Sequence, residues 1–573
     1  MVRNYFQLRG AFFYAAKSTS LLIAFITLFT PNSFAADPAP GAHAIATAHP
    51  VATAAGQEIL AQGGNAFDAA VAISATLAVV EPYGSGLGGG GFWLLHRAKD
   101  RFEVMIDGRE QAPAAAHRDM YLDEAGNAIG HLSLNGPLAA AIPGEPAALA
   151  HIAEKYGNLP LRQSLAPAIQ AAEKGFVVDE HYIKRARFRL EVMQSDPETA
   201  AIFLQNGQLP KPGYRIIQKD LANTLKQMAA KGRAGFYEGV VAQTLVREVR
   251  RAGGIWSEAD LKNYRVIERQ PVTGEYHGTR ITSAAPPSSG GIALITMLNV
   301  LAQYPLEQLP EATRTHLIVE AMRRAYRDRA QYLGDPDFID IPVERLTHPF
   351  YAAGLSASIR TDRATHSAEL PGYHLNQRGH HTTHFSVMDG EGNRVAATLS
   401  INYPFGAAFT PKGTGVLLND EMDDFSAKPG TPNAYGLVGA EANAIAPGKR
   451  PLSSMTPTFL ESDAGVAVLG TPGGSRIITM VLLGILEFSA DRSVLDVVSR
   501  ARFHHQFLPD AIQFEPNALS ESLQKELQQL GHHLKPMTRH YGNMQVVHWN
   551  KLSNTLSAAS DPRGGGEAVV LPE

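Results

Sequence analysis

The chain has 573 residues, a formal net charge of −4 at pH 7 and no cysteine. These values exclude disulfides, thiolate metal sites and a cysteine nucleophile, and they indicate no general attraction to nucleic acid. With 45% hydrophobic residues, a chain of this length can bury a large core without covalent cross-links.

The first 35 residues are predicted to form a secretory signal peptide. They contain three basic residues, no acidic residue and the apolar run "SLLIAFITLFT", which is too short to span a bilayer as a helix. Small residues at Ser33 and Ala35 predict cleavage after Ala35, and the loss of three positive charges changes the net charge from −4 to −7. An uncleaved membrane anchor is the alternative. We expect a periplasmic or secreted mature protein.

Helix and strand patterns mix throughout the mature chain, without linkers or repeats, which indicates one large layered α/β body. The segment "NAFDAAVAISATLAVVEP" predicts a buried helix that is capped by Asn65 and ends before Pro82. A G-x-G-x-x-G pattern follows, from Gly84 to Gly89. Here a helix precedes it and a strand follows, the reverse of a dinucleotide-binding turn, and no P-loop Lys follows. A tight turn with closely approaching backbones is favoured.

The segment "HLIVEAMRRAYRDRAQYLG", residues 316–334, predicts an amphipathic helix. Leu317, Ile318, Ala321 and Ala325 lie on one side, and the Arg/Asp run is predicted to form a solvated face. Residues 371–381, "PGYHLNQRGHH", have no periodicity and are predicted to be an exposed, cleavable segment.

The C-terminal part is richer in strands. "HFSVMD" and "RVAATLSIN" flank a glycine-containing turn and predict a β-hairpin, and "MQVVHWN" and "TLSAAS" predict another. "GVAVLGTPGGSRI" predicts a strand that runs into a glycine turn. "ESLQKELQQLG" predicts a helix with Leu523, Leu527 and Leu530 facing inward and Gly531 as its C-cap.

Several histidines were considered as metal ligands. His381 and His384 are three residues apart, which places them on opposite faces of a strand. His504–His505 and His532–His533 are adjacent pairs, which cannot point the same way in regular structure. Solvated or core-forming histidines are therefore favoured over a zinc site. No G-x-S-x-G is present to indicate a Ser-His-Asp triad.

Thr382 is the strongest candidate nucleophile. A threonine hydroxyl is weakly nucleophilic and needs a base. If the chain is cut before Thr382, the new α-amine on the same residue can accept the hydroxyl proton, since its pKa is about 8. This chemistry requires a Thr or Ser at the start of a strand after an exposed loop, and Thr382 satisfies both conditions.

Other motifs suit a ligand that carries both an ammonium and a carboxylate. The acidic segment "NDEMDDF" suits the ammonium, whereas Arg109 in "IDGREQAP" and the serines in "KRPLSSM" suit the carboxylate. "TPGGSR" offers consecutive backbone N–H groups for an oxyanion. Taken singly, each motif is equally compatible with an acidic loop, a helix cap or a glycine turn.

Together these motifs resemble the γ-glutamyltranspeptidases over nearly the whole mature chain. The motifs are "NAFDAAVA", "REQAP", "PPSSGGIAL", "TTHFSV", "NDEMDDFS", "KRPLSSM", "TPGGSRI" and "ASDPR". The resemblance implies an N-terminal-nucleophile hydrolase fold, a four-layer αββα sandwich. It also implies autocatalytic cleavage between His381 and Thr382, which gives a large subunit of residues 36–381 and a small subunit of residues 382–573.

The resemblance further implies transfer and hydrolysis of γ-glutamyl groups from glutathione and related donors to amino acids, dipeptides or water, without a metal or organic cofactor. It assigns Thr382 as the nucleophile, Ser400 as the hydrogen-bond partner of its amine, and Gly473 and Gly474 as the oxyanion hole. The α-amino group of the substrate would be bound by Asn402, Glu421 and Asp424, and its α-carboxylate by Arg109, Ser453 and Ser454. Tyr435 would be the gating aromatic residue of the lid-like segment "KPGTPNAYGLVG".

Some residues depart from the family pattern. Glu421 stands where enterobacterial members have Gln, and "NYPFG" replaces their "NTTFG" on the acceptor side near Tyr403. His381, before the bond to be cut, is also not the residue expected there. Two alternatives remain. A cephalosporin (glutaryl) acylase of the same fold is disfavoured because a glutaryl group has no ammonium for Asn402 and Glu421. The other is a periplasmic amino-acid-binding protein that is never processed.

Overall fold

The computed structural model describes residues 39–370, 382–428, 437 and 439–572. The predicted signal peptide, the predicted cleavable segment 371–381 and the predicted gating residue Tyr435 lie outside the described residues. No helix in the described part of the chain is long and apolar enough to cross a membrane.

Two sheets form the centre of the fold. One has seven strands in the order β18-β1-β9-β10-β2-β3-β6, and the other has six in the order β17-β16-β12-β11-β8-β7. Neighbouring strands in both sheets run antiparallel. Their bounds are β1 Ala42–Thr47, β2 Gly90–Arg97, β3 Phe102–Gly108, β6 Ile267–Arg269, β7 Val272–Tyr276, β8 Thr279–Ser283, β9 Thr383–Met388, β10 Arg394–Ser400, β11 Thr458–Glu461, β12 Gly465–Gly470, β16 Gln545–Asn550, β17 Thr555–Ser560 and β18 Glu567–Pro572. The short strands β4 Phe176–Val177 and β5 Arg215–Ile216 pair with each other, and β13 Phe503–His504, β14 Ile512–Phe514 and β15 Leu534–Pro536 form a small third sheet.

Alternating side chains of the central strands contribute to two different cores. In β2, Trp93 and Leu95 belong to the core beneath the helices of one outer layer. Phe92 and Leu94 belong to the core that contains residues of the six-stranded sheet. Successive strand side chains point to opposite faces, so a strand that is apolar at every position can bury both faces.

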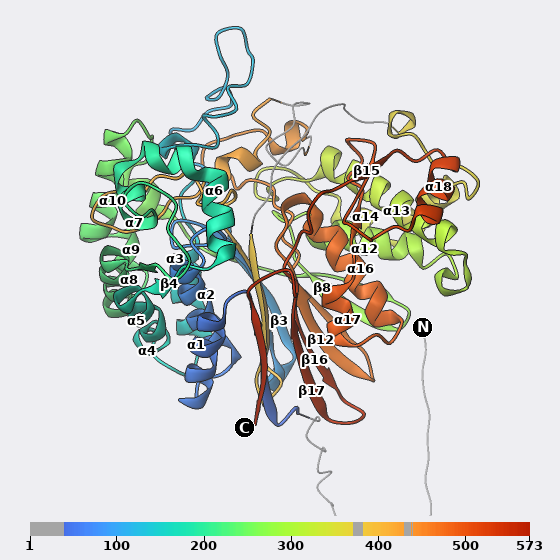
Figure 1. Ribbon diagram of the computed structural model, residues 1–573, viewed down its shortest axis with the longest axis horizontal. Helices are drawn as coiled ribbons and strands as arrows, with labels where there is room; N and C mark the ends of the chain where they lie inside the picture. The colour runs from blue at the N-terminus through green and yellow to red at the C-terminus, as the bar shows by residue number, and fades with distance from the viewer. Residues whose placement is uncertain (1–38, 371–381, 429–436, 438, 573) are drawn as a thin grey trace, which may run out of the picture. The chain divides into compact units, whose positions relative to one another are not determined.

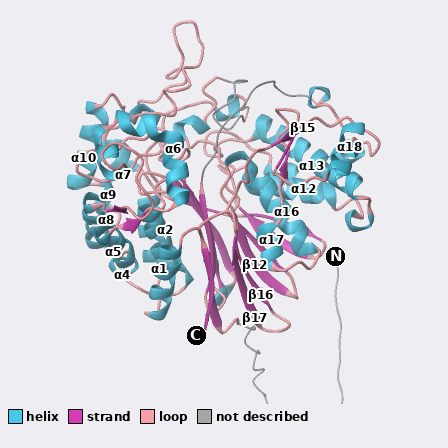
Figure 2. Cartoon of the chain, in the orientation of Figure 1, coloured by secondary structure: helices cyan, strands magenta, loops and turns pink. Residues whose placement is uncertain are grey.

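Helices cover the outer face of each sheet, as Figures 1 and 2 show. Helices α1, α2 and α3 contact the seven-stranded sheet, whereas α12, α16 and α17 contact the six-stranded sheet. The four layers confirm the predicted αββα sandwich. The helix bounds are α1 Pro50–Ala61, α2 Ala66–Val80, α3 Glu145–Lys155, α4 Leu161–Ser164, α5 Ala166–Lys174, α6 Glu180–Ser195, α7 Pro197–Phe203, α8 Lys219–Lys231, α9 Ala234–Tyr237, α10 Gly239–Arg251, α11 Glu258–Asn263, α12 Gly290–Leu301, α13 Glu311–Tyr332, α14 Val343–Thr347, α15 Pro349–Ala357, α16 Ile477–Ser489, α17 Val494–Ser499 and α18 Glu521–Gln529.

Most elements expected from the sequence are confirmed. Helix α2 begins after Asn65, whose side chain accepts hydrogen bonds from two backbone N–H groups of the first turn. The two predicted hairpins are β9–β10 and β16–β17, and β12 runs into the predicted glycine turn. In α18 the C-cap residue is Leu530, and Gly531 follows it with a φ of 94°, the usual place for a helix-ending glycine.

The predicted solvated face of helix 316–334 is wrong. In α13 the side chains of Arg323, Arg324 and Arg329 are buried, together with the predicted apolar side. Arg323 and Arg324 both form ion pairs with Glu320, which is also buried. Buried guanidinium groups are stable only when they are paired and hydrogen-bonded. A charge pattern alone does not reveal such internal pairing, so the helix resembled a surface helix.

Candidate active site

Thr382 lies immediately before β9, a central strand of the seven-stranded sheet. Its side chain is buried and lines two cavities, one of about 20 Å³ and one of about 630 Å³. The smaller pocket has room for about one water molecule, whereas the larger cavity has room for a small organic ligand. A nucleophile at this junction can hold one part of a substrate in each cavity.

The antiparallel pairing of β9 and β10 places Ser400 beside Thr382. Leu399 lies opposite Thr383 in this register, so Ser400, the last residue of β10, lies next to Thr382. The Ser400 hydroxyl accepts a hydrogen bond from the backbone N–H of Asn402 at 2.8 Å. Asn402 has a φ of 70°, which turns the chain at the end of the strand and brings its side chain into the small pocket.

The G-x-G-x-x-G turn supports this part of the site. A Cβ on Gly89 would lie 2.1 Å from the Ser400 carbonyl oxygen, and one on Gly88 would lie 2.0 Å from the Leu417 carbonyl oxygen. The Gly88 carbonyl oxygen also accepts a hydrogen bond from the Asn419 side chain at 2.6 Å. The predicted close backbone approach is confirmed, and it fixes the acidic segment that follows Asn419.

The small pocket brings together most of the predicted site residues, which are far apart in sequence. Its lining includes Thr382, Ser400, Asn402, Glu421, Asp424, Ser453, Ser454 and Gly474. Arg109 lies directly behind this lining, and its guanidinium forms ion pairs with Glu421 and Asp424. The predicted carboxylate-binding group and two predicted ammonium-binding groups are therefore paired with one another in the empty site.

Burial dominates the electrostatics of this cluster. It raises the pKa of Glu421 to about 7 and raises the pKa of Asp424, although the Arg109 guanidinium opposes both shifts. Glu110, also fully buried beside Arg109, has its pKa raised for the same reason. Three carboxyl groups thus surround one guanidinium group, and an added cation would reduce the repulsion among their negative charges.

A second buried guanidinium, which the sequence analysis missed, lies next to the serines. Arg329 of α13 donates hydrogen bonds to the Ser289 hydroxyl at 2.9 Å and to the Ser454 hydroxyl at 3.2 Å. A sequence signal was present, because Ala321, Ala325 and Arg329 recur every four residues and share one helix face. This spacing continues the apolar stripe and could have indicated an inward direction for Arg329, contrary to the solvated face that was predicted.

The glycine turn after β12 adjoins both cavities. Gly473 lines the large cavity and Gly474 the small pocket. Their φ values of 148° and 59° lie in the left-handed region, and a Cβ on Gly473 would lie 2.4 Å from the Met480 methyl carbon. The turn leads through a short 3-10 helix, Gly474–Arg476, into α16.

The sequence profile described as gamma-glutamyltranspeptidase matches residues 52–571. The chain belongs to the gamma-glutamyltranspeptidase family. It is 44% identical over 523 residues to the glutathione hydrolase proenzyme of Pseudomonas sp. (strain A14), covering 90% of this chain and 91% of that protein. These matches confirm the predicted family, whose members are N-terminal-nucleophile hydrolases that transfer and hydrolyse γ-glutamyl groups.

Solved structures agree with this gamma-glutamyltranspeptidase assignment. The cephalosporin acylase from Bacillus halodurans matches with a TM-score of 0.82 at 26% identity, covering 95% of this chain and 99% of the acylase chain. The Helicobacter pylori gamma-glutamyltranspeptidase matches with a TM-score of 0.56 at 39% identity, covering 56% of this chain and 93% of that chain. The matched transpeptidase chain covers little more than half of this chain, which limits its TM-score.

Of the histidines considered as metal ligands, His384, His504, His505 and His532 are buried, whereas His533 is exposed and His381 lies outside the described residues. His384 is buried beside the Thr398 hydroxyl, with Nδ1 and Oγ1 2.8 Å apart, and burial lowers the pKa of its imidazole to about 3. His316, Glu320 and His532 have potential ligand atoms within 4.8 Å of one another. The imidazoles of His316 and His532 hydrogen-bond each other at 2.8 Å, and Glu320 is paired with two guanidinium groups, which disfavours a metal cation there.

The predicted lid-like segment is described only in part. Leu437, which belongs to it, lines the small pocket. The roles assigned to individual residues of the gamma-glutamyltranspeptidase site, including the gating role of Tyr435, remain predictions.

Proposed function

We propose that this protein cleaves its own chain between His381 and Thr382 and then transfers or hydrolyses the γ-glutamyl group of glutathione and similar compounds through an ester on Thr382. One observation carries the proposal. Thr382 stands between a small pocket with buried guanidinium, carboxyl and hydroxyl groups and a larger cavity. The small pocket suits the glutamyl group, and the cavity suits the leaving amine or the acceptor.

The glutamyl group replaces the internal pairs of Arg109. A volume of about 20 Å³ holds roughly one water molecule. Glutamyl binding must therefore separate Arg109 from Glu421 and Asp424. The substrate α-carboxylate then takes the guanidinium together with Ser453 and Ser454, and its ammonium takes the two released carboxylates and Asn402. This exchange keeps every buried charge paired.

The chemistry begins when the α-amine of Thr382 takes the proton of its own hydroxyl. Oγ1 attacks the γ-carbonyl carbon, and the N–H groups of Gly473 and Gly474 stabilise the resulting oxyanion. The C–N bond breaks, and the leaving amine takes the proton from the Thr382 ammonium. Water or an acceptor amine then attacks the ester. The C–O bond to Thr382 breaks, and the proton of the attacking group returns to Oγ1 by way of the amine.

The first test replaces the nucleophile. Thr382→Ala is expected to remain one full-length chain on denaturing electrophoresis and to hydrolyse no γ-glutamyl anilide. Thr382→Ser is expected to retain some processing and some activity, because serine supplies a hydroxyl and an α-amine in the same geometry. The exposed Thr555→Ala serves as a matched control that should behave as wild type. A processed and active Thr382→Ala variant would refute the assignment.

A second test separates this function from glutaryl acylase activity. The two anilides differ only in the α-amino group, which Asn402, Glu421 and Asp424 are proposed to bind. We expect much faster cleavage of γ-glutamyl anilide than of glutaryl anilide, and the opposite order would favour the acylase. Export is proposed as well: the large fragment purified after secretion should begin at Ala36.

A further inference from the structure

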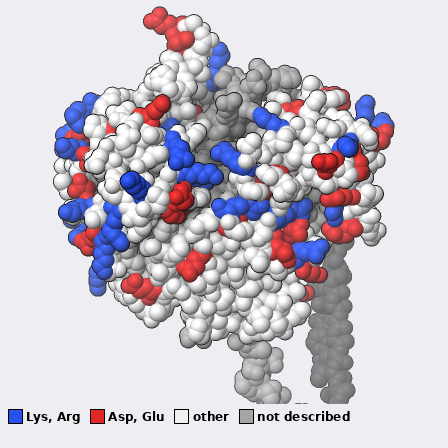
Figure 3. All heavy atoms as spheres, viewed as in Figure 1, with Lys and Arg blue, Asp and Glu red and all other residues white. Residues whose placement is uncertain are grey.

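Lys and Arg side chains far outnumber carboxylates in the lining of the large cavity beside Thr382. Figure 3 shows Lys and Arg side chains gathered around a hollow in the face drawn. The cationic lining residues are Lys184, Arg185, Arg539 and Arg563, accompanied by His181 and His540. Among the described lining residues, Glu81 is the single acid. The lining comes from both sides of the predicted cleavage site, so the completed cavity requires both subunits.

Much of this positive charge is not neutralised within the protein. Arg563 is paired with Asp561 and Glu515. Lys184 and Arg539, in contrast, form no ion pair with any carboxylate among the residues that the structure describes. Glu81 accepts a hydrogen bond from the Thr383 hydroxyl, and burial raises the pKa of its carboxyl group to about 7. Glu81 therefore supplies only part of a negative charge at neutral pH.

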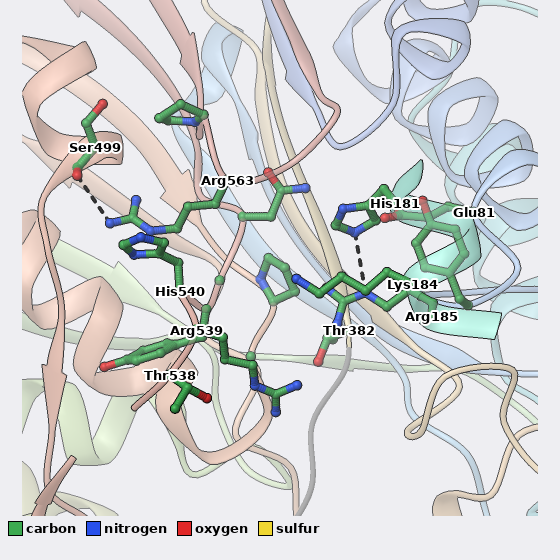
Figure 4. Close-up of a pocket in the computed structure, with 18 residues that line it drawn as sticks. Glu81, His181, Lys184, Arg185, Thr382, Ser499, Thr538, Arg539, His540 and Arg563 are labelled. Atoms are coloured by element: carbon green, nitrogen blue, oxygen red, sulfur yellow. Dashed lines mark hydrogen bonds between the residues drawn. The ribbon is translucent and has the colours of Figure 1, made fainter. Parts of the chain in front are cut away.

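Cationic groups of the cavity lie on both sides of the nucleophile. Figure 4 draws Lys184 and Arg185 on one side of Thr382 and Arg539 on the other. Arg185 extends from α6, and its Nε donates a hydrogen bond to His181 at 3.4 Å. Burial and the charge of Arg539 lower the pKa of Arg185 to about 10, although Glu81 opposes the shift. An anion placed between these guanidinium groups would relieve their mutual repulsion.

The cavity volume of about 630 Å³ lies within the usual range of about 300–1,000 Å³ for pockets that hold small organic ligands. It therefore has room for more than one residue of an acceptor, and its charge indicates which acceptors fit.

We propose that this cavity is a subsite for acidic acceptors, namely amino acids or short peptides with two carboxylates, whose acidic groups lie between Lys184, Arg185 and Arg539. This inference rests on the proposed function. The neutral acceptor amine attacks the ester carbonyl of the glutamyl-Thr382 intermediate, and its carboxylates stay in the basic part of the cavity. A C–N bond forms, the bond to Oγ1 breaks, and the proton of the amine returns to Thr382. Guanidinium groups suit this task because they bind carboxylates through two hydrogen bonds.

The experiment uses three acceptors of nearly equal shape that carry two, one and no carboxylates: glycyl-glutamate, glycyl-glutamine and glycyl-glutamine amide. Transfer from γ-glutamyl p-nitroanilide is followed as kcat/KM for each acceptor in the processed enzyme. We expect kcat/KM to fall by about threefold to fivefold with each carboxylate removed, the effect of one partly exposed ion pair. In Arg539→Gln and Lys184→Gln the three values should converge. Arg162→Gln on α4, an exposed arginine outside the cavity, should keep the wild-type series.

The ratios of kcat/KM between acceptors are compared within each variant, so a general loss of activity does not change these ratios. Equal kcat/KM for the three acceptors in wild-type enzyme that does hydrolyse the anilide would overturn the acidic subsite and leave the proposed function intact. A wild-type series that persists unchanged in both cavity variants would overturn the assignment to these residues. Absence of anilide hydrolysis in wild type would instead contradict the proposed function itself.

Discussion

Replacement of Arg329 by lysine tests whether this second buried guanidinium supports glutamyl binding. Arg329 is 5% exposed and donates from Nε to Ser289 and from Nη2 to Ser454. Lysine keeps the charge but has one compact donor group, so it cannot reach both hydroxyls with the same geometry. Loss of one hydrogen bond that involves a charged group costs about 2 kcal/mol, or roughly 30-fold in kcat/KM.

The assay is hydrolysis of a γ-glutamyl anilide by Arg329→Lys, with the melting temperature measured in parallel. We expect the loss mainly in KM for the donor, because Ser454 is proposed to hold the substrate carboxylate. Arg327→Lys on the same helix, whose side chain lies outside the pocket lining, is the matched control and should stay within about twofold of wild type. If Arg329→Lys retains the wild-type kcat/KM while it remains folded, the proposed role of Arg329 is wrong.

Three further predictions concern charge and backbone. Burial raises the pKa of Glu421 to about 7, so its carboxyl group becomes protonated and loses its attraction for the ammonium as the pH falls through 7. The KM for the donor should rise over the same pH range. Glu421→Gln should abolish that pH dependence. Gly473→Ala should lower kcat by about 10²–10³ through displacement of an oxyanion donor, whereas Gly253→Ala, also at positive φ but with open space around its Cβ, should cost only stability. The pKa of Glu320 is lowered to about 2 from an ordinary 4.5, because the attraction of two arginines outweighs the effect of burial. The shift contributes about 3 kcal/mol to the free energy of unfolding above pH 4.5, and this contribution is lost as the pH falls toward 2. Thermal melts of Glu320→Gln should lack that acid-dependent loss of stability.

The pattern of helices and strands predicted a layered α/β body, because strand alternation and turn chemistry are local properties. The residues that meet at Thr382 were predicted through the resemblance to the γ-glutamyltranspeptidases. Asn65, for example, caps its helix through atoms only two and three residues away. The glycine turn from Gly84 was also interpretable, since a helix before it and a strand after it excluded a nucleotide site.

Pairing between distant segments could not be predicted in the same way. The buried arginines of α13 depend on Glu320 on the same helix and on Asp510, which is 187 residues away from Arg323. Likewise, Arg109 pairs with Glu421 in the empty site, although each was assigned to a different end of the substrate. Side-chain identity predicted what these groups can bind, but only the three-dimensional arrangement shows what they bind when no substrate is present.

Peptide mapping by mass spectrometry, after rapid acid quenching of the enzyme during turnover of a γ-glutamyl donor, tests the central claim most directly. We expect a small subunit that begins at Thr382 and a glutamyl group attached to that first residue. An uncleaved chain, a different N-terminal residue or a glutamyl group on another side chain would contradict it.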